Sequence, residues 1–260
     1  MRLSEDQLRA LQQAELGVLK QFISFCDSHG LMYFAVGGTA LGCHKYSGFV
    51  PWDDDIDLAM PRNDYEKMLE LAPKELSNAL FVQTPETDLN YPYSFAKIRD
   101  IKTLYIEEET KDLRMVQGVF IDVFPIDEMS EKSFKRYLRK VKFYYAVMLA
   151  PTGGKRRRTF KGKIALFLSK FTKNRKLFRK IEKFRTAAKK GEIVCLQDIA
   201  YPKALVTRPR QLYLFNDLNI FSFGDVETFL KLRFGEIVTP PKDQQKPHHT
   251  PAAFSLHEKF

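Results

Sequence analysis

The sequence predicts a mixed fold of helices and strands, either α/β or α+β, and three observations support this prediction. Before residue 130, short apolar runs bounded by Gly and Pro alternate with amphipathic helical patterns. From Glu131 onward the pattern becomes helical. Apolar residues make up 44% of the 260 residues and aromatic residues 13%, which is enough for a packed core and excludes a wholly disordered chain.

The first predicted element is an amphipathic helix over residues 4–29. Ser4 and Gln7 match the capping-box pattern at its start, and Gly30 ends its apolar periodicity. The elements that follow are a buried strand at 31–36, a strand at 55–60, a helix opened by Pro61 that runs to about residue 71, strands at 97–103 and 104–107, and a strand at 119–124 closed by Pro125. After Thr239 the chain is polar, which is typical of a loop or an ordered extension.

The charge is distributed unevenly along the chain. The net charge is +10, but residues 132–190 hold 22 Lys and Arg and the single acid Glu182, a local charge of +21. The rest of the chain carries a net charge of −11. Because so many like charges repel one another, this segment indicates a polyanionic partner rather than a solvated helical face.

Composition also excludes several classes of protein. The longest apolar run has eight residues, at 143–150, whereas a membrane-spanning helix needs about 20. The first residues are acidic where a signal peptide is apolar, so we expect a cytoplasmic protein. The three cysteines, at positions 26, 43 and 195, form no CxxC pair, which excludes a disulfide framework and a zinc ribbon.

Four acids gather within five positions, at Asp53, Asp54, Asp55 and Asp57. Their mutual repulsion destabilises a fold unless a positive group offsets it, and a divalent cation is the simplest candidate. Side chains alternate along a strand, so Asp55 and Asp57 are expected on one face, with Asp53 joining them from the mouth of the strand. Oxygen ligands favour Mg²⁺ or Mn²⁺ over zinc.

Three alternatives compete with this interpretation. An EF-hand that starts at Asp53 fails, because Leu58 stands where Gly is required and Asp64 where Glu is required. A solvated acidic turn does not explain the apolar alternation of Ile56 and Leu58. The DxD motif of a nucleotide-sugar glycosyltransferase also places two acids on a metal and stays open.

Two further segments complete the pattern. Gly37 and Gly38 follow a predicted strand, where they form either a tight turn or a backbone that approaches a phosphate at the start of a helix. Asp122 lies among apolar residues of a later strand, and a buried acid there is costly unless it is paired or binds a metal. Asp122 is therefore the candidate for a third metal-binding carboxylate.

Several sequence blocks together point to a known family. They are Gly37-Gly38-Thr39-Ala40-Leu41-Gly42, Pro51-Trp52-Asp53-Asp54-Asp55-Ile56-Asp57, Met60-Pro61-Arg62-Asn63-Asp64-Tyr65, Lys97-Ile98-Arg99-Asp100, Ile121-Asp122-Val123-Phe124-Pro125-Ile126-Asp127, Phe234-Gly235-Glu236, Pro240-Pro241 and His248-His249. This pattern closely resembles the LicD family over about residues 20–250, although the likeness thins across the basic segment. Phe-Gly-Glu departs from the more usual Tyr-Gly-Asp.

The resemblance implies an α+β, nucleotidyltransferase-like mixed sheet flanked by helices. It divides the chain into a catalytic core at 1–130, a basic helical insert at 131–200, and a helical segment and tail at 201–260 that complete the domain. Bacterial members transfer phosphocholine from CDP-choline to a sugar hydroxyl of a teichoic acid precursor or a lipooligosaccharide. Related animal members transfer ribitol phosphate from a CDP donor.

Carried over by residue, the resemblance assigns Asp55 and Asp57 as the metal-binding pair, Asp122 as the third carboxylate, and Asp53 as an accessory ligand. Gly37, Gly38 and Thr39 match the loop that holds the donor phosphates. The implied reaction is attack of an acceptor hydroxyl on the β-phosphorus of a CDP-alcohol, CDP-choline first, with CMP leaving. Asp122 is the first choice for the base.

Other residues are weaker candidates for the donor site. Lys97 and Arg99 are two positions apart on a predicted strand, hence on one face, where they could clamp phosphates or simply lie at the surface. Trp52 lies beside the acids in the sequence and would suit a choline headgroup. The motif regions also contain His44, His248 and His249.

Three rival functions remain at this point. A DxD glycosyltransferase would release UDP or GDP. A nucleic-acid nucleotidyltransferase would use the same acids and hold RNA on the basic insert. A polyanion-binding module without catalysis leaves the acids unexplained.

The basic insert also predicts a location at a membrane. Cations beside helical apolar stripes are typical of interfacial helices at an anionic bilayer. We favour membrane docking over two alternatives: that the stripes only pack on the catalytic domain, and that the segment binds nucleic acid. The expected location is therefore the inner face of the membrane, reached from the cytoplasm. The three stripes are Phe134, Tyr137, Leu138 and Val141; Ile164, Phe167, Leu168 and Phe171; and Leu177, Phe178, Ile181 and Phe184.

Overall fold

The computed structural model describes residues 3–152, 159–236, 247 and 251–256. The helices are α1 (Glu5–Ser28), α2 (Gly37–Lys45), α3 (Arg62–Glu75), α4 (Glu131–Met148), α5 (Phe160–Ser169), α6 (Asn174–Thr186), α7 (Ala204–Thr207) and α8 (Val226–Phe234), with a short 3₁₀ helix at Ala150–Thr152. The strands are β1 (Phe34–Ala35), β2 (Asp57–Pro61), β3 (Leu80–Gln83), β4 (Ala96–Asp100), β5 (Leu104–Glu107), β6 (Val119–Met129), β7 (Ile193–Leu196), β8 (Ile199–Pro202), β9 (Gln211–Phe215), β10 (Leu218–Ser222) and β11 (Pro251–Ser255).

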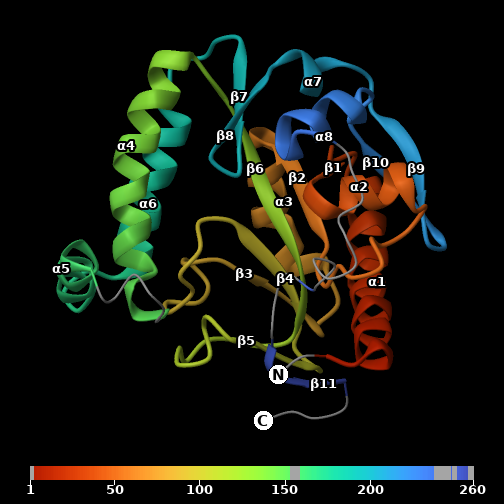
Figure 1. Cartoon of the computed structure of the whole chain (residues 1–260), viewed down its shortest axis with the longest axis horizontal. Coiled ribbons are helices and arrows are strands. Elements are labelled where there is room, and N and C mark those ends of the chain that lie inside the picture. The colour runs from red at the N-terminus through yellow and green to blue at the C-terminus, as the bar shows by residue number, and fades with distance from the viewer. Residues whose placement is uncertain (1–2, 153–158, 237–246, 248–250, 257–260) are drawn as a thin grey trace.

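A mixed sheet runs through the centre of the molecule (Figure 1). Its strand order is β3-β4-β6-β2-β1-β10-β9, and β7 and β8 extend it from the far end of β6. The β2–β6 and β1–β10 pairs are parallel, and the other pairs are antiparallel. A separate pair joins β5 to β11. Helices flank this sheet, so the predicted α+β class is confirmed.

The two faces of the sheet are covered by different helices. Leu58 and Met60 of β2 point into the core that α1 and α3 form. Ala59 points to the opposite face, into the core formed with α2 and α8. Because side chains alternate along a strand, Asp57 shares the face of Ala59, and on β6 Asp122 shares the face of Phe124. Both acids therefore lie on the face that α2 and α8 cover.

The first helix forms as its sequence predicts. The Ser4 hydroxyl accepts a hydrogen bond from the Gln7 N–H, and the Gln7 side chain accepts one from the Ser4 N–H. Its apolar stripe, which includes Leu11, Leu19 and Phe22, is buried against the sheet. The capping-box prediction is thus confirmed.

Pro125 does not end its strand, which corrects the prediction of a strand closed at that residue. The Asp122 N–H donates to the carbonyl of Ile56, the residue just before β2, so it points to the β2 edge of β6. Successive N–H groups of a strand point to opposite edges, so those of odd-numbered residues in β6 point to the other edge. Pairing with β4 ends at Val123 and pairing with β7 begins at Asp127. Pro125 lies in this gap, where the N–H that it lacks has no strand to bond.

The segment after residue 190 contains more strand than the sequence interpretation included. β7 and β8 pair with each other, and β7 also pairs with the end of β6. The β9–β10 hairpin adds to the main sheet through a parallel pair, in which Ser222 lies opposite Ala35. Only α7 and α8 are helices in the described part of residues 201–260.

The basic insert forms a helical layer beside β6, built from α4, α5 and α6 (Figure 1). Arg62 of α3 ties it to the sheet: its guanidinium donates to both carboxylate oxygens of Asp127, at 2.7 and 2.8 Å, and to Glu182 of α6 at 2.6 Å. Arg185 of α6 donates to the Ser94 carbonyl and to Glu182. Four mutually compensating charges therefore fix the insert to the core.

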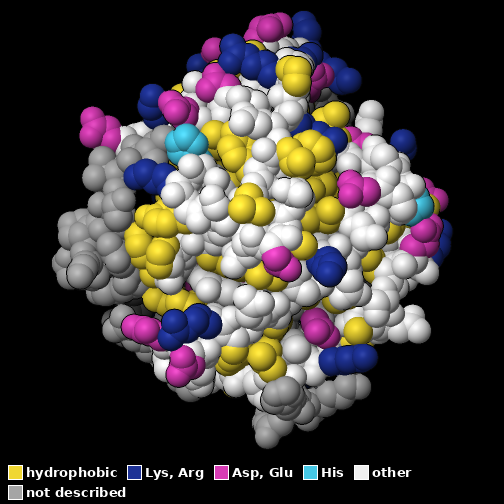
Figure 2. Space-filling model, turned by 90° about the vertical axis from the view of Figure 1, so that its right-hand side faces the viewer, with side chains coloured by type: hydrophobic (Ala, Val, Ile, Leu, Met, Phe, Trp, Pro, Cys, Tyr) yellow, Lys and Arg dark blue, Asp and Glu magenta, His cyan; other side chains and the backbone are white. Residues whose placement is uncertain are grey.

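Charges of both signs cover the opposite side of the molecule. Figure 2 shows Lys and Arg interspersed with Asp and Glu on that face, with hydrophobic side chains in separate patches. The excess of cations therefore belongs to the insert, as the sequence predicts. Among the described residues, no helix is both long enough and apolar enough to cross a bilayer.

Candidate active site

The structure brings together carboxylates that are far apart in the sequence. Asp57 at the start of β2 lies directly opposite Asp122 of β6 in the parallel register. The Asp122 N–H donates to the Ile56 carbonyl at 2.8 Å, which fixes this register one residue before Asp57. The two acids belong to the sheet face covered by α2, so the pairing of Asp57 with Asp122 is built into the sheet itself.

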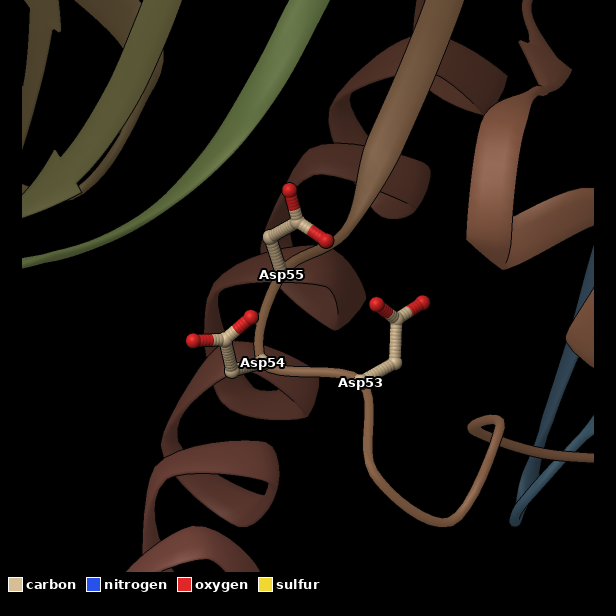
Figure 3. A group of neighbouring side chains, drawn as sticks. All are labelled: Asp53, Asp54 and Asp55. Atoms are coloured by element: carbon tan, nitrogen blue, oxygen red, sulfur yellow. The ribbon is translucent and has the colours of Figure 1, made fainter. Parts of the chain in front are cut away.

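Three more acids lie on the loop that enters β2. Figure 3 shows Asp53, Asp54 and Asp55 leaving consecutive positions of this loop, and ligand oxygens from all three lie within 4.8 Å of one another. The Gln12 side chain donates to the Asp53 carbonyl at 2.8 Å and so ties the loop to α1. Asp55 lies outside β2, which begins at Asp57, so the expected strand alternation of Asp55 and Asp57 is corrected: the loop, not the strand, positions Asp55.

The start of α2 closes onto these acids. A Cβ on Gly37 would lie 2.5 Å from Oδ2 of Asp57, and a Cβ on Gly38 would lie 2.1 Å from Oδ2 of Asp53. Gly37 also has φ +57°, a conformation that disfavours other residues. The Thr39 hydroxyl accepts a hydrogen bond from the Asp57 N–H at 2.8 Å. The two glycines are therefore required for the close approach of Asp53 and Asp57 to the positive end of a helix.

Asp122 has an unusual electrostatic environment. Burial raises the pKa of its carboxyl to about 6, although Lys97, whose Nζ lies 2.8 Å from Oδ1, acts in the opposite direction. Glu107 and Asp55 raise the pKa further. A carboxyl with a pKa near 6 suits a general base at neutral pH.

Lys97 and Arg99 share a face, as the sequence predicts, but both are buried in ion pairs. Lys97 contacts Asp122 and Glu107, and its ammonium lies 3.3 Å from the centre of the Phe120 ring. Arg99 has no exposed side-chain surface; it donates to Glu107, Gln83 and the Gly118 carbonyl. The structure thus places both cations in buried ion pairs: Lys97 with Asp122 and Glu107, and Arg99 with Glu107.

Sequence reasoning missed Glu15 of α1. Among the described residues, no group forms a hydrogen bond with Oε2 of this buried side chain. Burial raises the pKa of its carboxyl well above the ordinary value, and the charges of Asp55, Asp54, Asp53 and Asp122 raise it further. A signal did exist, because Glu15 occupies an apolar stripe at helical spacing with Leu11, Val18 and Phe22. An acid in such a stripe indicates a polar site underneath the helix.

The remaining sequence candidates are placed differently. Trp52 is half-buried in the acidic loop, with its ring 6.4 Å from Tyr46. His44 lies in the last turn of α2, about 10 Å along the helix from Gly37, and its Nε2 is 3.9 Å from Glu227 of α8. The structure does not bring His44 to the carboxylates. His248 and His249 lie outside the described residues.

A cavity of about 670 Å³ lies between the sheet and the insert, lined by residues of β6, α4 and α6 among others. Phe124 lines it two positions beyond Asp122 on β6, and Phe95 lines it two positions before Lys97, which pairs with Asp122. The Phe95 and Phe124 rings lie 4.4 Å apart. The cationic lining residues are Lys142, Arg185 and Arg233. The cavity therefore combines aromatic and basic groups on the same sheet face as the acids.

The acids fit the requirements of a hard divalent cation. They supply oxygen ligands alone, which suits Mg²⁺ or Mn²⁺. Asp53 and Asp57 face the start of α2, and the Asp53–Asp55 oxygens converge within bonding reach of one ion. Glu15 adds a buried oxygen without a hydrogen-bond partner next to them. Burial raises the pKa of Glu15 most, and a cation in the cluster would offset the repulsion from the neighbouring acids that raises it further.

A family model and a curated relative match this chain. The family model described as LicD/FKTN/FKRP, nucleotidyltransferase domain, matches residues 30–163, which include α2, the acidic loop, β2 and β6. The lipopolysaccharide cholinephosphotransferase LicD of Haemophilus influenzae is 32% identical over 115 residues. Those residues cover 44% of this chain and 43% of that relative, so the match spans less than half of either protein.

Proposed function

Since the chain belongs to the LicD family, we propose that it transfers a phospho-alcohol, most directly phosphocholine, from a CDP-alcohol to a hydroxyl of a cell-surface glycan or its lipid-linked precursor. The name of the relative, a lipopolysaccharide cholinephosphotransferase, supports the transferred group and the acceptor class. The observation that carries the proposal is the position of Asp53 and Asp57 against the two glycines at the start of α2. Asp55 lies beside Asp53, and Asp122 lies opposite Asp57.

The proposed reaction is a displacement at phosphorus. The acceptor hydroxyl oxygen bonds to the β-phosphorus, the bond from that phosphorus to the bridging oxygen breaks, and CMP leaves with the bonding electron pair. Charge neutralisation and alignment provide most of the catalysis in such transfers. A Mg²⁺ or Mn²⁺ ion bound by Asp53, Asp55 and Asp57 would neutralise the donor pyrophosphate. Asp122, which Lys97 holds, would then be free to act on the acceptor.

Asp122 is the residue that we assign to the acceptor proton. Its carboxyl has a pKa of about 6, so it is ionised at pH 7 and still basic enough to accept a proton. Lys97 at 2.8 Å holds the carboxylate in place and offsets its charge in the buried sheet. Lys97 is therefore a positioning residue, and Glu107 and Arg99 hold it in turn.

The cavity lined by Phe95 and Phe124 is the place that we assign to the acceptor. The donor phosphates are expected at the acidic loop and the start of α2, so the acceptor must approach Asp122 from the insert side. Phe95 and Phe124 offer flat apolar surfaces to a sugar ring, and Lys142 and Arg233 offer positive charge to an acidic glycan. The insert thereby contributes to acceptor choice.

The leaving nucleotide distinguishes this proposal from its rivals. The protein is incubated with Mg²⁺ and CDP-choline, UDP-glucose or GDP-mannose in turn, together with a lipooligosaccharide acceptor, and the released nucleotide is identified by chromatography. The proposal predicts CMP from CDP-choline and phosphocholine on the acceptor. Release of UDP or GDP with sugar transfer, and no CMP, would instead establish a glycosyltransferase.

A further inference from the structure

The three apolar stripes of the basic insert have different surroundings. The stripes of α4 and α6 pack into a common core, in which Tyr137, Val141, Leu177 and Ile181 are buried. These stripes are therefore structural. The expectation that all three stripes meet a membrane does not fit α4 and α6, because their apolar side chains already contact one another.

The stripe associated with α5 is exposed except for Leu168, which packs against this core, and Phe160 extends the exposed part. Exposed fractions are 79% for Phe160, 43% for Ile164, 61% for Phe167 and 74% for Phe171. Their spacing of four, three and four residues places Phe160, Ile164 and Phe167 on one side of α5, and Phe171 follows in the turn after the helix ends at Ser169. Ala165, on the inner side, is buried. A row of large apolar side chains thus faces outward, where it costs free energy in water.

Cations surround this exposed row. Lys161, Lys163, Lys170 and Lys173 are all exposed, and in the described ranges no acid lies within ion-pair distance of them. The sequence places Lys155-Arg156-Arg157-Arg158 immediately before the helix. Figure 1 shows α5 at the outer margin of the molecule, beyond α4 and α6. An approaching flat surface therefore meets α5 without obstruction from the sheet.

We propose that α5 docks on an anionic lipid bilayer, with Phe160, Phe167 and Phe171 in the boundary between headgroups and acyl chains. An apolar row between cations is the arrangement that such a surface recognises: acyl chains accept the rings and anionic headgroups attract the lysines. Nucleic acid would use the cations but leave the outward apolar row in water. This inference goes beyond the proposed reaction and does not depend on it.

Vesicle co-sedimentation of the full chain tests the proposal. Vesicles of phosphatidylcholine alone are compared with vesicles that contain 40% phosphatidylglycerol. The variant Phe160→Ser/Phe167→Ser/Phe171→Ser removes the rings and keeps every charge. The matched control, Leu212→Ser/Leu214→Ser, removes side chains that are 51% and 52% exposed on β9, on another part of the molecule. Circular dichroism and thermal unfolding verify that both variants fold.

The wild-type chain is expected to bind the anionic vesicles at least tenfold more tightly than the neutral ones and to bind more weakly as salt rises. The triple Ser variant is expected to lose at least tenfold, whereas the β9 control retains wild-type binding. A folded triple Ser variant that binds like the wild type would overturn the proposal, and so would a lack of wild-type binding to anionic vesicles.

A fluorescence arm separates insertion from surface attraction. In Phe167→Trp, the new indole is expected to shift its emission to shorter wavelength on anionic vesicles, because it leaves water. An unshifted spectrum during binding would refute insertion of α5. Sedimentation velocity without lipid provides the second check: self-association that the triple Ser variant abolishes would identify a second copy of the chain as the occupant instead.

Discussion

Asp57 of β2 lies opposite Asp122 of β6 in a parallel register, so two acids that are 65 residues apart in the sequence occupy neighbouring positions on one sheet face. The same face receives the start of α2, where Gly37 and Gly38 leave room for the oxygens of Asp57 and Asp53. The site thus depends on backbone geometry as much as on its acids. Each prediction below changes one part of that arrangement.

Replacing Gly38 with Ala is expected to abolish most activity. A Cβ at this position would lie 2.1 Å from Oδ2 of Asp53, so either the carboxylate or the start of α2 must move. Displacements of this size typically cost about 100-fold in turnover. Gly17→Ala is the matched control, because its Cβ would meet nothing within 4 Å. The control is expected to stay active and to gain up to about 1 kcal/mol in free energy of unfolding.

The rate is expected to fall as the pH drops through about 6, because the Asp122 carboxyl takes up a proton there. Since the charge of Lys97 lowers the pKa of Asp122, removing it in Lys97→Met should move the acid limb of kcat/KM to higher pH. The measurement is CMP release between pH 5 and 8 at saturating Mg²⁺. An acid limb at the wild-type position in Lys97→Met would rule out this role for Lys97.

Glu15→Gln is expected to stabilise the chain in the presence of a chelator. Burial and four neighbouring acids raise the pKa of Glu15, so the folded state binds this proton more tightly than the unfolded state does. Stability therefore falls as the pH rises above the unfolded pKa of about 4.3, and Gln escapes this loss. Melting temperatures in EDTA should favour the variant more at pH 8 than at pH 5. Glu70→Gln, on the exposed surface of α3, should show no such trend.

Arg62→Ala is expected to destabilise the fold by about 3–5 kcal/mol, because it leaves the carboxylates of Asp127 and Glu182 short of a buried partner. Arg175→Ala removes a surface ion pair with Glu86 and should cost less than about 1 kcal/mol. Urea unfolding of the two variants provides the comparison. Equal losses would contradict a specific anchoring role for Arg62.

The sequence predicted the acids but not the way in which they are assembled. Strand alternation and the apolar neighbours of Asp122 predicted Asp57 and Asp122 as candidates. Local pattern does not predict that β2 and β6 are neighbours, because the two strands are far apart in the sequence. Glu15 was recognisable as an acid within the apolar stripe of α1, but the pattern does not state which acids it meets, because they come from a separate loop. The strand end predicted at Pro125 was wrong. A proline fits inside β6 there because β4 and β7 leave a gap along that edge of the strand, and only the complete sheet shows this gap.

The apolar stripes show the same limit. Apolar residues recur at helical spacing in the segments of α4, α5 and α6, which predicts a helix with an apolar stripe in each case. Which stripe is buried depends on which helices contact one another, and α4 packs against α6 while α5 leaves its Phe row exposed. Periodicity therefore predicted the helices but could not distinguish a core face from a docking face.

Mg²⁺-dependent release of CMP from CDP-choline by Asp57→Asn, Asp122→Asn and the double variant tests the central claim most directly. If the carboxylates act as one unit, each single change should lower turnover at least 1000-fold, and the double change should cost little more than either single change. Asp112→Asn, an exposed acid outside the site, should turn over like the wild type. A folded Asp57→Asn chain with wild-type turnover would contradict the account.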